Sequence, residues 1–178
     1  MGVPYVPVMG LVGTDLLARR DDMIVAPDPF GSGKSTVVAK AMQPDVAIFH
    51  VEKADRYGNC SAGYPVEAVV LSEASKHVIV TAEEIVDKVT EKDAVGCFLP
   101  GILVDRVAHA PFGAHPGALT RYYGVDRTHM MRYVAASKDD GAFAEYVQAH
   151  VFDVADHAEY VERFVPQAWR DAVRNRVA

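Results

Sequence analysis

The sequence predicts an α/β protein with a mostly parallel sheet flanked by helices, followed by a helical C-terminal tail. Over the first 125 residues, apolar segments of strand length alternate with segments of helical pattern, an arrangement typical of parallel sheets. Residues 46–51 form an almost unbroken apolar run, as expected for a strand that is covered on both faces. From Asp126 onward, apolar residues recur at helical spacing. We therefore expect a single domain over residues 1–178, with the sheet in 1–125 and the helical tail in 126–178.

Composition restricts the class of protein and its partners. The chain has 178 residues, of which 50% are hydrophobic and 24% are charged, so it should bury a core and fold. Its net charge is −6 and no basic stripe is present, which argues against a nucleic-acid partner. No apolar run approaches the roughly 20 residues that a membrane helix needs, and the first residues lack the pattern of a signal peptide. The two cysteines, Cys60 and Cys97, form no Cys-x-x-Cys pair, so we expect reduced thiols in a cytoplasmic protein.

The N-terminal part contains short candidate strands. Residues 3–8 alternate apolar residues with two prolines, which predicts an irregular or edge strand because proline cannot donate to a ladder. A turn follows, in which Thr14 or Asp15 could cap a short helix that ends at Arg19. Further strands are predicted over residues 23–26 and 36–41, with a loop rich in Pro, Gly and Ser between them.

The segment Gly-Ser-Gly-Lys-Ser-Thr, residues 31–36, resembles part of a nucleotide-binding P-loop. The full motif G-x-x-x-x-G-K-[ST] requires glycine at position 28, where the sequence has Asp28. A carboxylate there would repel a triphosphate. The β-branched residues after Ser35 also favour a strand over the helix that the motif demands. The P-loop is therefore the disfavoured interpretation of this segment.

Residues 45–59 are the centre of the prediction. The apolar strand leads into a polar turn, in which Asp55, Gly58 and Asn59 are typical turn formers. Ligands bind at such strand ends in open parallel sheets, although Asp55 and Asn59 are more simply explained as bracing their own turn. His50, near the end of the strand, is either a hydrogen-bonded core residue or a site residue that faces the crevice.

The next elements are predicted from caps and periodicity. Pro65 fits the first turn of a helix that packs one apolar face, through Ala74, on the sheet. Residues 78–80 form a strand pattern. Thr81 with Glu84 then matches a capping box, which predicts a short helix through residue 87.

The remaining chain leads from a connecting segment, residues 90–101, to a strand over 102–110. That strand ends in the Pro- and Gly-rich turn 111–117. In the tail, a last helix that begins at Pro166 should pack Trp169 and its apolar neighbours inward.

No motif identifies a reaction. The sequence contains neither a G-x-S-x-G nucleophile elbow nor an H-E-x-x-H metal motif. His109 and His115 flank the turn after residue 110, but they lack a third ligand at a zinc-like spacing, so no metal is predicted. The polar residues near predicted strand ends form no acid–base pair by spacing; they are Thr14, Asp15, Asp55, Asn59 and His115. The residues alone thus predict a crevice but not its chemistry.

A series of short segments carries a resemblance to a known family. They are Pro-Tyr-Val-Pro at 4–7, Gly-Leu-Val-Gly-Thr-Asp at 10–15, Pro-Phe-Gly at 29–31, Pro-Asp-Val-Ala-Ile-Phe-His at 44–50, Ala-Asp at 54–55 with Gly-Asn at 58–59, Val-Thr-Ala-Glu-Glu-Ile at 80–85, and Pro-Phe-Gly-Ala-His-Pro at 111–116. In this order and spacing they resemble the A subunit of family I coenzyme A transferases of the glutaconate type. The resemblance runs from Val3 to about Tyr123.

The resemblance implies a Rossmann-like α/β fold and a heteromeric enzyme whose active site lies between an A and a B subunit. It implies transfer of coenzyme A, as a co-substrate, from an acyl-CoA to a free carboxylic acid, with no other cofactor. A glutamate of the B subunit would attack the thioester, so no catalytic nucleophile is implied in this chain, and Glu52, Glu83 and Glu84 lie outside such a motif. The implied substrate-binding residues are Gly10, Thr14, Asp15, His50, Asp55, Asn59, Gly113 and His115.

Two differences from the family pattern leave alternatives open. The Gly-x-Gly-Gly-Phe loop of the family's A subunits is absent, so the chain resembles a C-terminal portion that is incomplete at the N-terminus. Met9 stands where many relatives carry a basic residue. One alternative is a hydrolase on the same scaffold that opens a ring or cleaves a carbon–carbon bond of a CoA thioester. The other is a non-catalytic chain that stabilises a partner subunit.

Overall fold

The computed structural model describes residues 2–63 and 67–177, and contacts divide the chain into two compact units. The first unit runs to Asp45 and includes Ala74–Lys76. The second unit comprises Val46–Glu73 and the chain from His77 onward. The expectation that residues 1–178 form a single domain stays a prediction.

The first unit is an antiparallel sheet. Its strands are β1 (Tyr5–Val8), β2 (Met23–Pro27) and β3 (Ser35–Lys40), in the order β1-β3-β2. The strands expected in this region are therefore confirmed, and β1, with its prolines, takes an edge as its composition predicts. These strands pair with each other in antiparallel register and are separate from the strand that follows.

The loop that resembled a P-loop has a different structure. Lys34 directly precedes the strand β3, whereas a P-loop lysine opens a helix. The carboxylate of Asp28 accepts hydrogen bonds from the backbone N–H groups of Phe30 and Ser32 at 3.0 and 3.1 Å. Because those N–H groups are occupied by an internal carboxylate, they do not form a phosphate cradle.

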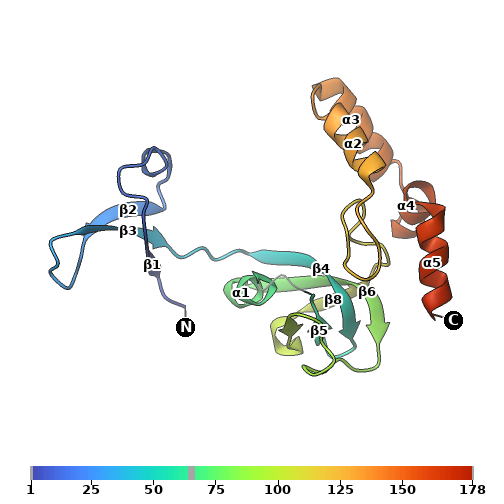
Figure 1. Ribbon diagram of the computed structural model, residues 1–178, viewed down its shortest axis with the longest axis horizontal. Helices are drawn as coiled ribbons and strands as arrows, with labels where there is room; N and C mark the ends of the chain where they lie inside the picture. Colours follow the sequence, from blue (N-terminus) through green and yellow to red (C-terminus); the bar gives the residue numbers. More distant parts are fainter. Residues whose placement is uncertain (1, 64–66, 178) are drawn as a thin grey trace. The chain divides into compact units, whose positions relative to one another are not determined.

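The second unit contains a mixed sheet with the order β7-β5-β4-β6-β8. Its strands are β4 (Val46–Asp55), β5 (Cys60–Ser61), β6 (His77–Val86), β7 (Phe98–Leu99) and β8 (Arg106–His109). The strands β4, β6 and β8 run parallel, and β5 and β7 extend the sheet in antiparallel register (Figure 1). The α/β class is confirmed, with the parallel pairs concentrated in β4, β6 and β8.

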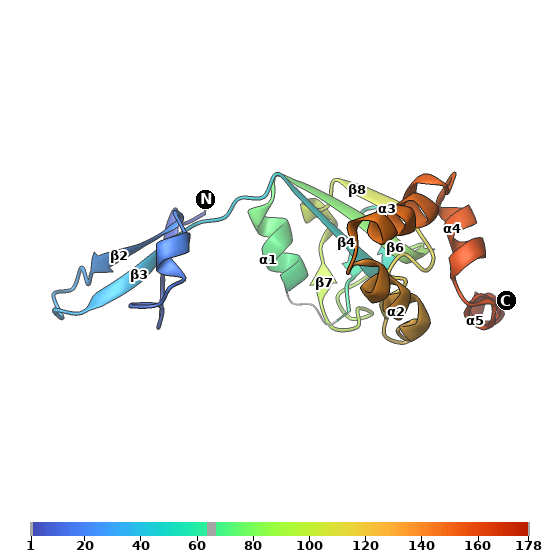
Figure 2. The same ribbon diagram turned by 90° about the horizontal axis from the view of Figure 1, so that it is seen from above.

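The core of the second unit lies on this sheet. Fully buried residues of the long strands, among them Val51 and Val80, meet Ala68 of helix α1 (Glu67–Ala74). Figure 2 shows α1 beside the sheet. The helix expected after Pro65 is thus found, although Pro65 itself lies outside the described residues.

Local signals misassigned two segments. The capping box of Thr81 and Glu84 predicts a helix, but β6 continues through Val86 because it pairs with β4 over its whole length. In addition, the strand expected over 102–110 begins only at Arg106, after a 3₁₀ turn at Gly101–Leu103. For β6, pairing with a distant strand outweighs the local pattern.

The helical tail is confirmed. It contains α2 (Arg127–Ala136), α3 (Asp140–Val147), the π-helix η3 (Gln148–Phe152), α4 (His157–Phe164) and α5 (Gln167–Val177). Asp126, Asp139 and Asp156 cap α2, α3 and α4 through their side chains, as expected for aspartate at N-caps. Trp169 packs in a second core with Phe112 and Tyr123. Among the described residues, no helix is long and apolar enough to cross a membrane.

Candidate functional site

His50 is held where β4 and β6 run side by side. His50 and Thr81 are opposite each other in this parallel pair, so their side chains lie on the same face of the sheet. Nδ1 of His50 lies 2.9 Å from Oγ1 of Thr81, and its Nε2 lies 3.2 Å from Oε2 of Glu83. The imidazole is only 10% exposed. The hydrogen-bonded and nearly buried ring agrees with the core interpretation of His50, and a role of this residue in a substrate site stays a prediction.

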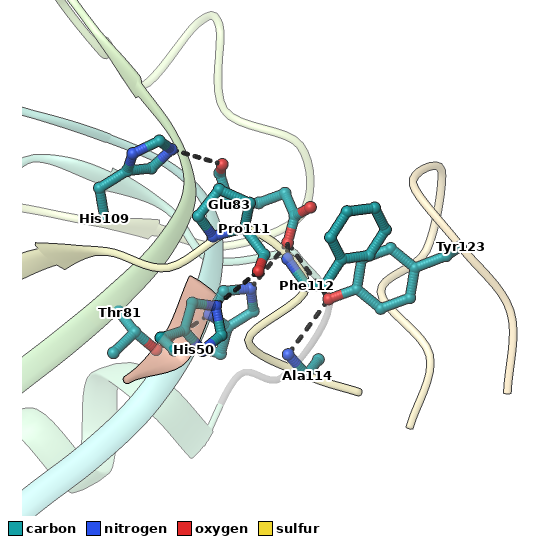
Figure 3. Close-up of polar contacts among 9 residues, drawn as sticks. His50, Thr81, Glu83, His109, Pro111, Phe112, Ala114 and Tyr123 are labelled. Atoms are coloured by element: carbon teal, nitrogen blue, oxygen red, sulfur yellow. Dashed lines mark hydrogen bonds and ion pairs between the residues drawn. The ribbon is translucent and has the colours of Figure 1, made fainter. Parts of the chain in front are cut away.

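Glu83 is the centre of this network (Figure 3). It is 2% exposed, and its Oε2 accepts hydrogen bonds from the backbone N–H of Phe112 at 2.8 Å and the hydroxyl of Tyr123 at 3.2 Å. Burial raises the pKa of Tyr123, which keeps this hydroxyl protonated as a donor. Within residues 2–63 and 67–177, Oε1 of Glu83 is buried without a hydrogen-bond partner. A buried acceptor that lacks a donor is costly in a purely structural residue.

The loop after β8 closes against His50. Phe112 takes a left-handed backbone with φ of 60°, and its N–H donates to Glu83. A Cβ added at Gly113 would lie 2.7 Å from Nδ1 of His50 and 2.8 Å from the carbonyl oxygen of Ala110. The backbone at residue 113 can therefore approach the imidazole only because it carries no side chain.

Replacing Gly113 with alanine is expected to lower the free energy of unfolding by about 1–3 kcal/mol, the usual cost of overpacking a filled site. Urea denaturation measures the change. Gly124→Ala is the matched control, because nothing lies within 4 Å of a Cβ there, and it should shift stability by less than about 0.5 kcal/mol. Equal effects of the two replacements would contradict the close approach to His50.

The turn after β4 is braced by its own side chains. The carboxylate of Asp55, 1% exposed, accepts hydrogen bonds from the N–H groups of Tyr57, Asn59 and Val89 and from Nδ2 of Asn59, at 2.8 to 3.0 Å. Burial alone would raise the pKa of Asp55, but these hydrogen bonds outweigh it and hold the pKa below the ordinary value. Oδ1 of Asn59 accepts from the N–H of Gly101 at 3.0 Å. Bracing of the turn therefore accounts for the polar groups of Asp55 and Asn59. A role of these two residues in substrate binding stays a prediction.

The other predicted site residues belong to different parts of the chain. Gly10, Thr14 and Asp15 belong to the first unit, where Oγ1 of Thr14 donates to the carbonyl of Leu11 at 2.8 Å and caps no helix. His115 is 8% exposed and contacts Tyr160 and Asp126. The structure thus brings His50 together with Gly113, and Asp55 together with Asn59.

A cleft of about 370 Å³ lies next to β4 and β6. Charged residues dominate its lining, among them Glu52, Lys53, Glu84 and Arg121. Lys53 and Glu84 form an ion pair at 3.2 Å. Glu52 is 3% exposed, and burial raises its pKa despite the opposing charges of Arg121 and Lys53. Arg121 has a left-handed backbone with φ of 79°, a conformation that residues with a Cβ keep at a cost and that is concentrated at ligand sites.

Sequence reasoning did not identify Glu83, Glu52 or Arg121 as site residues. One signal was available, because Glu83 and Glu84 interrupt an otherwise apolar strand, and buried acidic residues require a reason. The partners of Glu83 come from residues 29 and 40 positions away, so local spacing could not identify them.

Comparison with known proteins identifies the family. A sequence profile described as Coenzyme A transferase matches residues 1–110. This chain belongs to the coenzyme A transferase family. The match covers the first unit together with β4, β6 and β8 of the second, and the resemblance to the A-type half of such an enzyme is confirmed.

The family members with similar chains are longer. The chain is 32% identical over 180 residues to the A subunit of glutaconate CoA-transferase from Acidaminococcus fermentans, covering 92% of this chain and 56% of that relative. The crystal structure of glutaconate coenzyme A-transferase from that organism matches with a TM-score of 0.84 and 29% identity, over 94% of this chain and 58% of that chain. A variant of the decarboxylase AibA/AibB matches with a TM-score of 0.70 and 33% identity, over 83% and 53% of the two chains. This chain therefore spans somewhat more than half the length of these relatives.

Proposed function

We propose that this chain is the A-subunit portion of a heteromeric enzyme that transfers coenzyme A from an acyl-CoA to a free carboxylic acid. The observation that carries the proposal is the family match over residues 1–110, together with the similarity to the A subunit of a glutaconate CoA-transferase over most of this chain. Coenzyme A acts as co-substrate, and no further cofactor is invoked. The two free thiols, Cys60 and Cys97, support a cytoplasmic location.

We place the nucleophilic glutamate on a B subunit. An acyl anhydride formed on a carboxylate is quickly hydrolysed by bulk water, so a site closed between two subunits suits this chemistry. In this chain, Glu83 is buried under His50, Phe112 and Tyr123, which fits a group that positions its neighbours better than one that attacks a thioester. The cleft beside Glu52 and Arg121 is lined by as many carboxylates as cations, and we assign it to the carboxylate of the acid, with the Arg121 guanidinium as its partner.

The test uses the chain assembled with its B subunit. Acetyl-CoA and glutaconate are mixed with the complex, and the CoA thioesters that form are separated and identified by mass spectrometry. Exchange of CoA between the two acids is expected. Borohydride reduction during turnover should mark a glutamate of the B subunit, whereas the peptides of this chain should stay unchanged. A mark on Glu52, Glu83 or Glu84 contradicts the assignment of the nucleophile.

A second candidate is an enzyme on the same scaffold that breaks a carbon–carbon bond of a CoA thioester. The decarboxylase AibA/AibB, with 33% identity, favours this candidate. The same assay separates the two, since the thioester then stays intact while the acyl chain gains water or loses carbon dioxide. A complex that forms but changes no thioester would instead support a non-catalytic role for this chain.

A further inference from the structure

Three potential metal ligands converge at the junction between the loop after β8 and the helical tail. His115 comes from the loop, Asp126 caps α2, and His129 lies in the first turn of that helix. One ring nitrogen of each histidine and one carboxylate oxygen of Asp126 lie within 4.8 Å of one another. His115 and His129 are 8% and 3% exposed. The sequence showed His115 without a third ligand at suitable spacing, and folding supplies the missing groups.

Each of the three groups has one atom fixed by a neighbour. Nδ1 of His115 lies 2.8 Å from the hydroxyl of Tyr160, and Nε2 of His129 lies 2.7 Å from the hydroxyl of Tyr146. Oδ1 of Asp126 accepts from the N–H of His129 at 2.9 Å. Nε2 of His115 and Oδ2 of Asp126 contact each other at 3.3 Å, and among the described residues Nδ1 of His129 makes no hydrogen bond. Hydrogen bonds to the outer nitrogen of a ligating histidine are the usual support of a metal site.

The distances suit a small divalent ion. Zinc bound to nitrogen and oxygen at about 2.0–2.2 Å in tetrahedral geometry places its ligand atoms about 3.4 Å apart. Nε2 of His115 and Oδ2 of Asp126 are already 3.3 Å apart. The three ligand atoms lie within 4.8 Å of one another, so the remaining separations must close by about 1.5 Å or less to reach this spacing.

Two imidazoles and one carboxylate form a donor set that zinc accepts.

We propose that Nε2 of His115, Nδ1 of His129 and Oδ2 of Asp126 bind a zinc ion. The ion links the loop that carries Phe112 and Gly113 to the start of α2. Three protein ligands leave one coordination position for water. This site is distinct from the Glu83 network and does not depend on the proposed CoA transfer.

The test measures zinc directly on the full chain in its assembled form. Equilibrium dialysis against zinc, followed by elemental analysis, should find one zinc per chain. Asp126→Asn removes the anionic ligand, but asparagine still caps the helix, so the chain should fold. Its zinc affinity should fall at least about 100-fold, because losing a hydrogen-bond partner of a ligand already costs about 10–100-fold. Tyr146→Phe removes such an outer partner and should weaken zinc binding about 10–100-fold.

His77→Gln is the matched control, because the side chain of His77 is 68% exposed and its Nδ1 lies 3.8 Å from Oδ2 of Asp105; this variant should bind zinc as the unchanged chain does. Cobalt substitution gives a second readout. Tetrahedral Co²⁺ bound at this site should show visible absorption in the unchanged chain, and this absorption should be lost in Asp126→Asn. The proposal is overturned if the unchanged chain binds no stoichiometric zinc, or if Asp126→Asn binds it equally well. In either case the three residues form a hydrogen-bonded network only.

Discussion

Replacing Asp55 with alanine should lower the free energy of unfolding by about 3–5 kcal/mol, because several donors lose a buried charged acceptor at once. The N–H groups of Tyr57, Asn59 and Val89 would each lack a partner. Val89 is itself buried, so water cannot easily replace the carboxylate there. Urea denaturation followed by circular dichroism measures the loss.

The matched control is Asp45→Ala. Asp45 also forms a charged contact, at 2.8 Å to Lys76, but its side chain is 83% exposed, and such pairs contribute at most about 1 kcal/mol. A loss for Asp55→Ala no larger than the loss for Asp45→Ala would contradict the bracing role.

The effect of Asp55 should also depend on pH. Its pKa in the folded chain lies below the ordinary value of 3.8, so the ionised carboxylate stabilises the fold at any pH above that ordinary value. This contribution is lost as the pH falls through the folded pKa, because the group then binds a proton in both states. The stability gap between the unchanged chain and Asp55→Ala should therefore be constant near neutral pH and shrink on acidification below 3.8.

Replacing Glu83 with alanine should lower the free energy of unfolding by about 2–4 kcal/mol, because it leaves buried donors unpaired and opens a void. The N–H of Phe112 and the hydroxyl of Tyr123 lose their acceptor, and the ring of His50 loses one of its two contacts. Thermal and urea denaturation measure the change. Glu83→Gln should cost less, since the amide oxygen can still accept from Phe112.

The control for Glu83 is the next residue on the same strand. Glu84 pairs with Lys53, and the side chains are 31% and 46% exposed, so Glu84→Ala should cost less than about 1 kcal/mol. If the two alanine variants are equally stable, the buried network around Glu83 does not hold the loop after β8.

Much of the fold could be predicted from the sequence where the signal is local. The apolar run of β4 and the helical periodicity after Asp126 each carry enough information within a few residues. Asp126 was expected to begin the tail, and it caps α2 as a good N-cap residue does. The short strands β5 and β7 have two residues each, too few for any periodicity.

The candidate site could be predicted only in part because its contacts are distant in the chain. His50 was expected near a strand end, but β4 continues to Asp55 and places His50 in its middle. Glu83 lies in a strand that local capping signals had assigned to a helix. The antiparallel sheet of the first unit was not foreseen either, since the strand pattern of β1, β2 and β3 is the same for both directions of pairing. The direction of strand pairing depends on tertiary contacts, which the local pattern of a single sequence does not reveal.

The turn at the end of β4 has a consequence for folding rates. Asp55 reaches the N–H of Val89, 34 residues away, and Asn59 reaches Gly101, 42 residues away. Contacts between such distant residues close long loops, which slows folding. We expect these two contacts to form after the transition state, so that weakening them accelerates unfolding and leaves the refolding rate almost unchanged. The turn would then determine how long the native state persists.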